Sequence, residues 1–260
     1  MKIIYTFCII LLLISFESIG QVKTKSITKL TNIESSYPYW SPDGSMIVFQ
    51  SNRNDIDNTD IYSMNADGKN LAQLTTAEGY DELPIWSPDG KQILFSSTRD
   101  GNYEVYIMDT DGKNQRNLTK HASYDSHPNF SPDGKTIIFN STRDEPNHDE
   151  LMSFTRDSNV ELYEMDIEGG NVKRVTNYFS WDTYPDISPD GSKIAFRRRT
   201  VDTVMGKVIG NSEVFIANRD GTKAYNLSNH PAYDGWPAWS PDGSKIAFAS
   251  DRERKHNWQI

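Results

Sequence analysis

Alternating hydrophobic and polar positions recur five times along the chain, each time directly after the four letters SPDG. The segments that follow, such as "KQILFSS" and "KTIIFNS", place an isoleucine two residues before a phenylalanine. A period of two residues is typical of a β-strand that buries one face. Serine, proline, aspartate and glycine in this order suit a tight turn. Each SPDG is therefore predicted to join two strands of a β-hairpin.

Two further strand signals complete each repeat. A third segment, as in "NYEVYIM", leads into a second turn, as in "DTDGKN", and a short fourth segment ends in "LT" or a close variant. Successive SPDG serines lie 44 to 57 residues apart. Four strands per repeat at this period are typical of propeller blades. The pattern predicts an all-β fold, a β-propeller with four complete four-stranded blades and a partial fifth. The predicted repeats span residues 32–75, 76–119, 120–176, 177–228 and, incompletely, 229–260.

The repeat resembles the TolB-like propeller repeats, which are related to WD-repeat blades. The residues that carry the resemblance are the LT, the proline before a tryptophan or another large residue, SPDG, and the isoleucine and phenylalanine after it, from about Ile27 to the end. The resemblance implies blades around a central channel, usually six, with a protein or peptide bound at its mouth. TolB itself carries an α/β domain before its propeller, whereas here the repeats follow the leader directly.

The two ends of the repeat array predict an open ring. The last repeat ends in "NWQI", which aligns with the start of a third strand, and Ser26–Thr31, "SITKLT", matches a fourth strand. Propellers close when one terminal strand completes the blade begun by the other. Because a fourth strand needs a third strand beside it, we expect Ser26–Thr31 to stay unpaired with the blade that contains Phe248. The expected fold is an incomplete ring of a six-bladed type.

The first 20 residues are predicted to be a secretory signal peptide, with the propeller domain over residues 21–260. Lys2 precedes an apolar run from Ile3 to Phe16, and the small residues Ser18 and Gly20 follow. The alternative, a membrane anchor, is disfavoured because a span needs about 20 apolar residues. We therefore expect a periplasmic or secreted protein with no membrane span after cleavage. Cleavage also removes the only cysteine, so no disulfide or thiolate metal site is expected.

Charge narrows the partners. The formal net charge is −9, and an excess of acidic groups repels the phosphates of nucleic acids and of anionic membranes. We expect no nucleic-acid partner, and a field that favours neutral or basic ligands. The protein is expected to be a monomer.

Catalytic signatures are absent from the sequence. There is no G-x-S-x-G motif and no room for a hydrolase domain, and the DG turns lack the ligand spacing of a calcium loop. His121 and His230 occupy equivalent positions, but the other repeats have no histidine there. We therefore expect no catalytic, cofactor or metal site. The alternatives are a carbohydrate-active or metal-dependent enzyme at the channel mouth, like the oligogalacturonate lyase propellers, or the propeller of a longer peptidase.

The topology of a meander predicts which face carries function. The SPDG and DG turns share one face, and the blade-to-blade crossings share the other with the long loops Glu145–Ser158 and Val201–Gly210. Each crossing, as in "SYDSHP", places an aspartate three residues before a proline and an aromatic residue before the aspartate. We predict that these residues surround the channel mouth and form the partner-binding face. They are Asp81, Asp125, Asp182 and Asp234, with Tyr80, Tyr124, Trp181 and Tyr233.

An alternative role for the aspartates is purely structural. Arginines end the second strands on the same face, and Asp–Arg pairs within or between blades would satisfy both charges. The fourth repeat has Thr200 where the others have arginine, and the first has Ser35 where the others have aspartate. The basic run Arg197–Arg199 is interpreted as a solvated strand end. The arginines in question are Arg53, Arg99, Arg143 and Arg252.

The hypothesis favoured by the sequence is an exported, non-enzymatic propeller scaffold. It would bind a protein or peptide of the cell envelope through the face that carries the crossings and the long loops.

Overall fold

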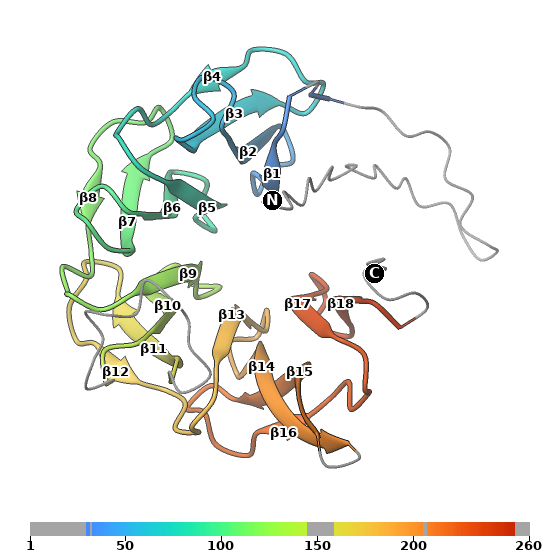
Figure 1. Ribbon diagram of the computed structural model, residues 1–260. Helices are drawn as coiled ribbons and strands as arrows, with labels where there is room; N and C mark the ends of the chain where they lie inside the picture. Colours follow the sequence, from blue (N-terminus) through green and yellow to red (C-terminus); the bar gives the residue numbers. More distant parts are fainter. Residues whose placement is uncertain (1–29, 32, 145–158, 205–206, 253–260) are drawn as a thin grey trace.

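The computed structural model describes residues 30–31, 33–144, 159–204 and 207–252, and it shows an open ring of β-blades (Figure 1). The described residues include no helix, so none that could cross a membrane. The predicted signal peptide, the loop Glu145–Ser158 and the final "NWQI" segment lie outside the described residues.

Each complete blade is an antiparallel meander whose strands succeed one another outward from the centre of the ring (Figure 1). Blade 1 consists of β1 (Ser36–Trp40), β2 (Met46–Ser51), β3 (Asp60–Asn65) and β4 (Ala72–Gln73). Blade 2 consists of β5 (Asp81–Trp86), β6 (Gln92–Ser97), β7 (Glu104–Asp109) and β8 (Arg116–Asn117). Blade 3 consists of β9 (Asp125–Phe130), β10 (Thr136–Ser141), β11 (Glu161–Asp166) and β12 (Lys173–Arg174). Blade 4 consists of β13 (Asp182–Ile187), β14 (Lys193–Val204), β15 (Lys207–Asn218) and β16 (Tyr225–Asn226). The partial blade 5 consists of β17 (Asp234–Trp239) and β18 (Ile246–Ser250).

The SPDG turn is stabilised by its own side chains, as the first repeat shows. The Ser41 hydroxyl donates to Asp43 Oδ1 at 2.6 Å and accepts from the Met46 backbone N–H at 2.9 Å. Asp43 Oδ1 also accepts from the Ser45 N–H at 3.0 Å, and these hydrogen bonds lower the pKa of Asp43 to about 2. Gly44 lies at φ +70°, a left-handed conformation that glycine adopts without steric cost. The motif therefore fixes the hairpin that the sequence predicts.

The "LT" motif connects a blade to its own third strand. In blade 3 the Thr176 hydroxyl accepts from the Leu162 N–H at 2.9 Å and donates to the Glu161 carboxylate. Thr119 makes the same contacts with Val105 and Glu104 in blade 2. The buried acidic residue that opens each third strand is thus part of a hydrogen-bonded lock.

The hydrophobic core lies between neighbouring blades. Between blades 2 and 3, Leu94 and Ile107 of one sheet pack against Ile137 and Phe139 of the next, and all four are fully buried. Leu118, the leucine of the LT motif, belongs to the same cluster. Equivalent clusters join blades 1 and 2 and blades 3 and 4. The alternation read from the sequence therefore marks faces that pack against adjacent blades.

One predicted loop is wrong. Residues 201–210 continue the hairpin of blade 4, because β14 and β15 remain paired from Lys193 opposite Asn218 to Val204 opposite Lys207. Alternating valine and threonine in this stretch favours extended strands, so the insertion lengthens a hairpin instead of forming an irregular loop.

The ring is open, as the sequence predicts (Figure 1). Within the described residues, β18 pairs only with β17. Leu30 lies beside Gly68 of blade 1, the same relation that Leu74 has to Gly112 of blade 2. Leu30 therefore occupies the position of a fourth-strand leucine from a preceding blade, in agreement with the match of "SITKLT" to a fourth strand. Residues 26–29 lie outside the described part of the chain.

Candidate functional site: the central channel

The four predicted aspartates lie inside the blades. Each is the first residue of an innermost strand, and at most 1% of its surface is exposed. Asp81 pairs with Arg99 at 2.7 Å and Asp125 pairs with Arg143 at 2.8 Å. Asp234 pairs with Arg252 at 2.7 Å. The ion pairs offered above as the structural alternative are present, and each joins two strands of one blade.

Blade 4 has its arginine at a different position. Asp182 forms two hydrogen bonds with Arg198, of 2.7 and 2.6 Å, and Arg198 is only 6% exposed. Arg198 lies two residues before Thr200, so the pair is kept although the usual arginine position is lost. Two sequence interpretations are therefore corrected: blade 4 does not lack the arginine, and the run Arg197–Arg199 is not a solvated strand end. The mirror case is blade 1, where Arg53 reaches the Ser35 hydroxyl at 3.2 Å.

The aromatic residues that precede the aspartates differ from one another in their surroundings. Tyr80 is 44% exposed. The Tyr124 ring lies 4.8 Å from that of Tyr103, and the Trp181 ring lies 4.5 Å from the Arg199 guanidinium. Tyr233, the fourth, contacts the Trp236 ring at 5.8 Å. The structure thus brings these residues into separate local contacts and does not join all four in one cluster.

A second set of five residues is brought together at the centre of the ring. Every innermost strand bulges at the residue before its proline, and each of these residues has a left-handed backbone with φ between 50° and 57°. Such a conformation costs about 1–3 kcal/mol for a residue other than glycine. We call this set the channel collar. It consists of Tyr37, Leu83, His127, Tyr184 and Trp236.

The collar residues contact one another and the neighbouring blades. The His127 ring lies 4.0 Å from that of Tyr184, which lies 5.6 Å from Trp236. The Leu83 N–H donates to the Gln50 side-chain oxygen of blade 1 at 2.8 Å. Hydrogen bonds from the preceding blade therefore help to hold the strained backbone, and the bulge directs bulky side chains toward the channel.

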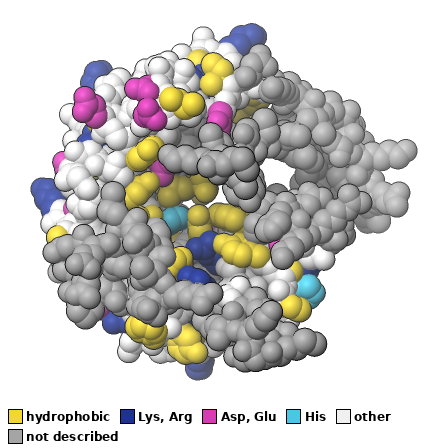
Figure 2. All heavy atoms as spheres, in the orientation of Figure 1, with side chains coloured by type: hydrophobic (Ala, Val, Ile, Leu, Met, Phe, Trp, Pro, Cys, Tyr) yellow, Lys and Arg dark blue, Asp and Glu magenta, His cyan; other side chains and the backbone are white. Residues whose placement is uncertain are grey.

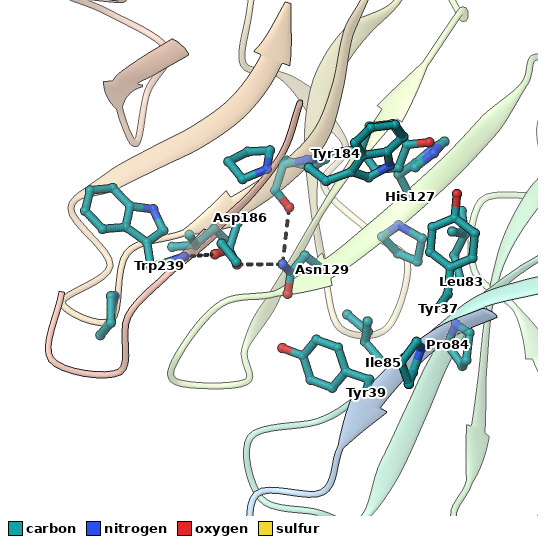
Figure 3. Close-up of a pocket in the computed structure, with 18 of the residues that line it drawn as sticks. Tyr37, Tyr39, Leu83, Pro84, Ile85, His127, Asn129, Tyr184, Asp186 and Trp239 are labelled. Carbon is teal, nitrogen blue, oxygen red and sulfur yellow. Dashed lines mark hydrogen bonds between the residues drawn. The ribbon is translucent and has the colours of Figure 1, made fainter. Parts of the chain in front are cut away.

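The collar borders a cavity of about 390 Å³ at the SPDG end of the innermost strands. Its wall is formed by the collar, the prolines that follow it, the residues after those prolines, and the turns of blades 4 and 5. Figure 2 shows hydrophobic, basic and histidine side chains gathered around the hollow at the centre of the ring. Figure 3 shows side chains from several innermost strands around the cavity. The residues after the prolines are Tyr39, Ile85, Asn129, Asp186 and Ala238.

Asp186 is the one carboxylate among the residues that line this cavity, and none of them is a lysine or an arginine. Its two oxygens accept from the Trp239 backbone N–H at 2.7 Å and from Asn129 Nδ2 at 2.9 Å (Figure 3). Burial raises the pKa of Asp186 to about 6, because the ionised form loses water of solvation. Among the described residues, Asp186 forms no ion pair. It is therefore a largely ionised, uncompensated acid at pH 7.

His127 is neutral at pH 7. Burial lowers its pKa to about 3, and the nearby positive charge of Arg197 acts in the same direction. Arg197 donates from Nε to Thr183 at 2.9 Å and donates to the Tyr233 hydroxyl, and its guanidinium lies 4.8 Å from the Tyr184 ring. The collar is thus aromatic and uncharged, with a cation beside it and a carboxylate in the cavity.

The described residues contain no group of three or more histidine, cysteine, aspartate or glutamate side chains arranged to hold a metal ion. His121 Nδ1 instead contacts the Ser123 hydroxyl at 2.7 Å, and His230 Nδ1 accepts from the Ala232 N–H at 3.1 Å. These two histidines stabilise the crossings in which they lie.

Sequence reasoning missed the collar, although the repeats contain a signal for it. The residue before the crossing proline differs in every blade but one, while the positions around it repeat. In an array of similar blades, a varied position inside a repeated frame indicates a surface that is not used for packing between blades. The collar and the residues after the prolines fit that description.

The PD40 family, described as the TolB beta propeller domain, matches residues 14–148, which is just over half of the chain. The chain belongs to the TolB β-propeller family. This membership agrees with the four-stranded blades and with the resemblance that the repeats carry.

Individual members and structures support the same family. The protein TolB homolog of Chlorobium chlorochromatii is 29% identical over a match that covers 35% of this chain and 29% of the relative. The crystal structure of TolB from Acinetobacter baumannii is 26% identical with a TM-score of 0.68, covering 90% of this chain and 53% of that one. The chain thus spans about half of that TolB or less. Oligogalacturonate lyase from Vibrio parahaemolyticus, at 19% identity and a TM-score of 0.62, covers 91% of this chain and 66% of its own, and shares the fold.

Proposed function

We propose that this protein is an exported, non-enzymatic propeller scaffold that binds a peptide or protein partner in the cell envelope, with the central channel as the binding site. Family membership and the signal-like first 20 residues support the setting, periplasmic or secreted. The channel collar carries the proposal for the site. Five strained non-glycine residues cost several kcal/mol in total, and backbone strain of this kind concentrates at functional sites.

The proposed binding surface includes both ends of the channel. The cavity offers prolines and aromatic side chains for an extended chain to contact, as in other aromatic grooves that bind peptides. The crossing residues Tyr80, Tyr124, Trp181 and Tyr233 are proposed to extend this surface on the opposite face. The aspartates beside them act indirectly, because their burial leaves the carboxylates out of reach of a partner.

Alanine variants of the aspartates would be a poor test. Removing one member of a buried ion pair typically costs about 3–5 kcal/mol, so Asp125→Ala or Asp182→Ala would weaken its blade and confuse folding with binding. A better choice is Tyr39, which lines the cavity and is 42% exposed. Its matched control is Tyr225 on the outermost strand of blade 4, which is 52% exposed.

The test compares capture of envelope proteins by immobilised wild type, Tyr39→Ala and Tyr225→Ala. We expect Tyr39→Ala to lower recovery of the captured partner about tenfold, because aromatic residues carry much of the energy of such contacts. Tyr225→Ala should leave it unchanged, and circular dichroism should confirm the fold of both variants. Equal recovery by all three proteins would contradict a channel site.

A metal-dependent or carbohydrate-active enzyme at the channel mouth is the competing function. The shared fold of the oligogalacturonate lyase is the observation in its favour. Metal analysis of the purified protein decides between the two. Stoichiometric manganese or zinc that is lost on replacing His121 or His230 would favour the enzyme.

A further inference from the structure

The cavity beside the collar combines one fixed carboxylate with an apolar wall. Asp186 is held in place by the Trp239 N–H and by Asn129, whose side chain also donates to the Pro185 carbonyl at 3.2 Å. A carboxylate offers about four acceptor positions, and these bonds use two of them. The remaining positions are left for another donor.

The groups facing Asp186 are uncharged. On the opposite side of the cavity lies Tyr39, whose pKa is raised to about 12, first by burial and then by the Asp186 charge. His127, the other titratable base in the wall, is neutral at pH 7. The rest of the wall consists of apolar side chains such as Ile85, backbone, and the rings of proline, tyrosine and tryptophan. No described group in the cavity wall therefore balances the carboxylate.

We propose that the cavity is a specificity pocket for a basic side chain, lysine or arginine, of the bound partner, with Asp186 as its counter-ion. The inference rests on the proposed function and identifies the chemistry of the ligand. An apolar ligand group would leave the carboxylate buried and unpaired, and an acidic group would repel it. A basic side chain pairs with Asp186 while its alkyl stem lies along Ile85 and the prolines.

Two further observations agree with a cationic ligand. The aromatic faces in the wall attract cations, an interaction that strengthens when water is excluded. The whole chain carries a net charge of −9, which raises the local concentration of basic ligands near its surface. The cavity volume of about 390 Å³ has room for a side chain of this length.

The experiment uses small analogues of the two side chains with the full-length secreted protein. The probes are n-butylammonium for lysine, n-butylguanidinium for arginine, and 1-butanol as the neutral control of similar shape. Binding is followed by NMR through the indole N–H signal of Trp239 and the carboxylate carbon of Asp186. The variants are Asp186→Asn and, as a control for net charge, Asp111→Asn at an exposed turn on the same face.

We expect both cations to shift the two signals saturably and 1-butanol to bind at least about fivefold more weakly. Asp186→Asn should weaken cation binding about tenfold, whereas Asp111→Asn should leave it unchanged. If Asp186→Asn fails to fold, the wild-type pH profile decides: cation affinity should rise as the pH increases through about 6, where Asp186 ionises. Equal binding of 1-butanol and the cations, or no cation binding above pH 7, would overturn the proposal.

The outcome separates this proposal from the proposed function. If the cations do not bind but partner capture still depends on Tyr39, the channel is the binding site and the basic specificity is wrong. If the cations bind at Asp186 while capture is insensitive to Tyr39, the pocket exists but the partner binds elsewhere.

Discussion

Two kinds of glycine in this chain occupy left-handed backbone for different reasons. Gly134 ends the third SPDG at φ +69°, and a Cβ atom added there would meet only Pro88, at an ordinary contact distance of 3.9 Å. Gly112 ends a DG turn at φ +81°, and its Cβ would lie 2.5 Å from the Leu74 backbone oxygen of the preceding blade. The first glycine is required by its torsion alone, and the second is also required by the close packing of two blades.

Alanine at these two positions should therefore have unequal effects. We predict that Gly134→Ala lowers the free energy of unfolding by about 1–2 kcal/mol, the cost of a left-handed residue with a Cβ. Gly112→Ala should cost more, since blades 1 and 2 must also shift apart. Urea unfolding followed by circular dichroism measures both, with partner capture as a check on the channel. Equal midpoints for the two variants would contradict the proposed packing role of Gly112.

At the scale of the element, the acid that opens each third strand shows how one motif works with and without a cation. In blade 3, Glu161 pairs with Arg174 at 2.8 Å. In blade 2, Asn117 stands on the strand that corresponds to that of Arg174, and Glu104 accepts only from neutral donors, Thr119 and the His121 N–H. Burial then raises the pKa of Glu104 to about 7 from its ordinary 4.5.

This shift predicts a pH dependence of stability. The folded chain holds the Glu104 proton more tightly than the unfolded chain, so the stabilisation is complete below pH 4.5 and is lost as the pH rises toward 7. Glu104→Gln should reduce the slope of unfolding free energy against pH in this window. Asn117→Arg, which copies blade 3, should reduce it as well. Urea titrations from pH 4.5 to 8 measure the slope, and a slope equal to that of the wild type in both variants would refute the assignment.

The elements were predictable from the sequence to the extent that each depends on local chemistry. SPDG, the isoleucine–phenylalanine alternation and LT each act within a few residues or one hairpin, so their residue types indicate their structure. The bulge at Leu83 and its equivalents was not predictable, because a residue before proline normally prefers negative φ. Its positive φ depends on partners such as Gln50 in the neighbouring blade. Arg198 was missed for a similar reason, since a two-residue shift along a strand changes the position but not the pair.

At the scale of the molecule, the open ring determines which surfaces lack a partner blade. Blades 2 to 4 each lie between two others, whereas β18 pairs only with β17 among the described residues. The side chains of β18 are correspondingly less buried: Phe139 of blade 3 is fully buried, while its equivalent Phe248 is half-buried. The order of the blades and the opening followed from counting repeats, but the position of the cavity required the structure.

Hydrogen exchange should reveal this difference. We predict that amides of β18 exchange at least about tenfold faster than those of β10, which is paired on both sides. Peptides covering residues 246–250 and 136–141 provide the comparison within one experiment. Equal protection of the two strands in the monomer would indicate a closed ring and contradict the open architecture.

The central claim, that partners bind in the channel, is tested most directly by photo-crosslinking in the living cell. A photoreactive phenylalanine analogue replaces Tyr39 in the cavity or, as the control, Tyr225 on the outer edge of blade 4. We predict a discrete crosslinked envelope partner from position 39 and none from position 225. A partner that crosslinks from position 225 and not from position 39, or no crosslink from either, would contradict the account.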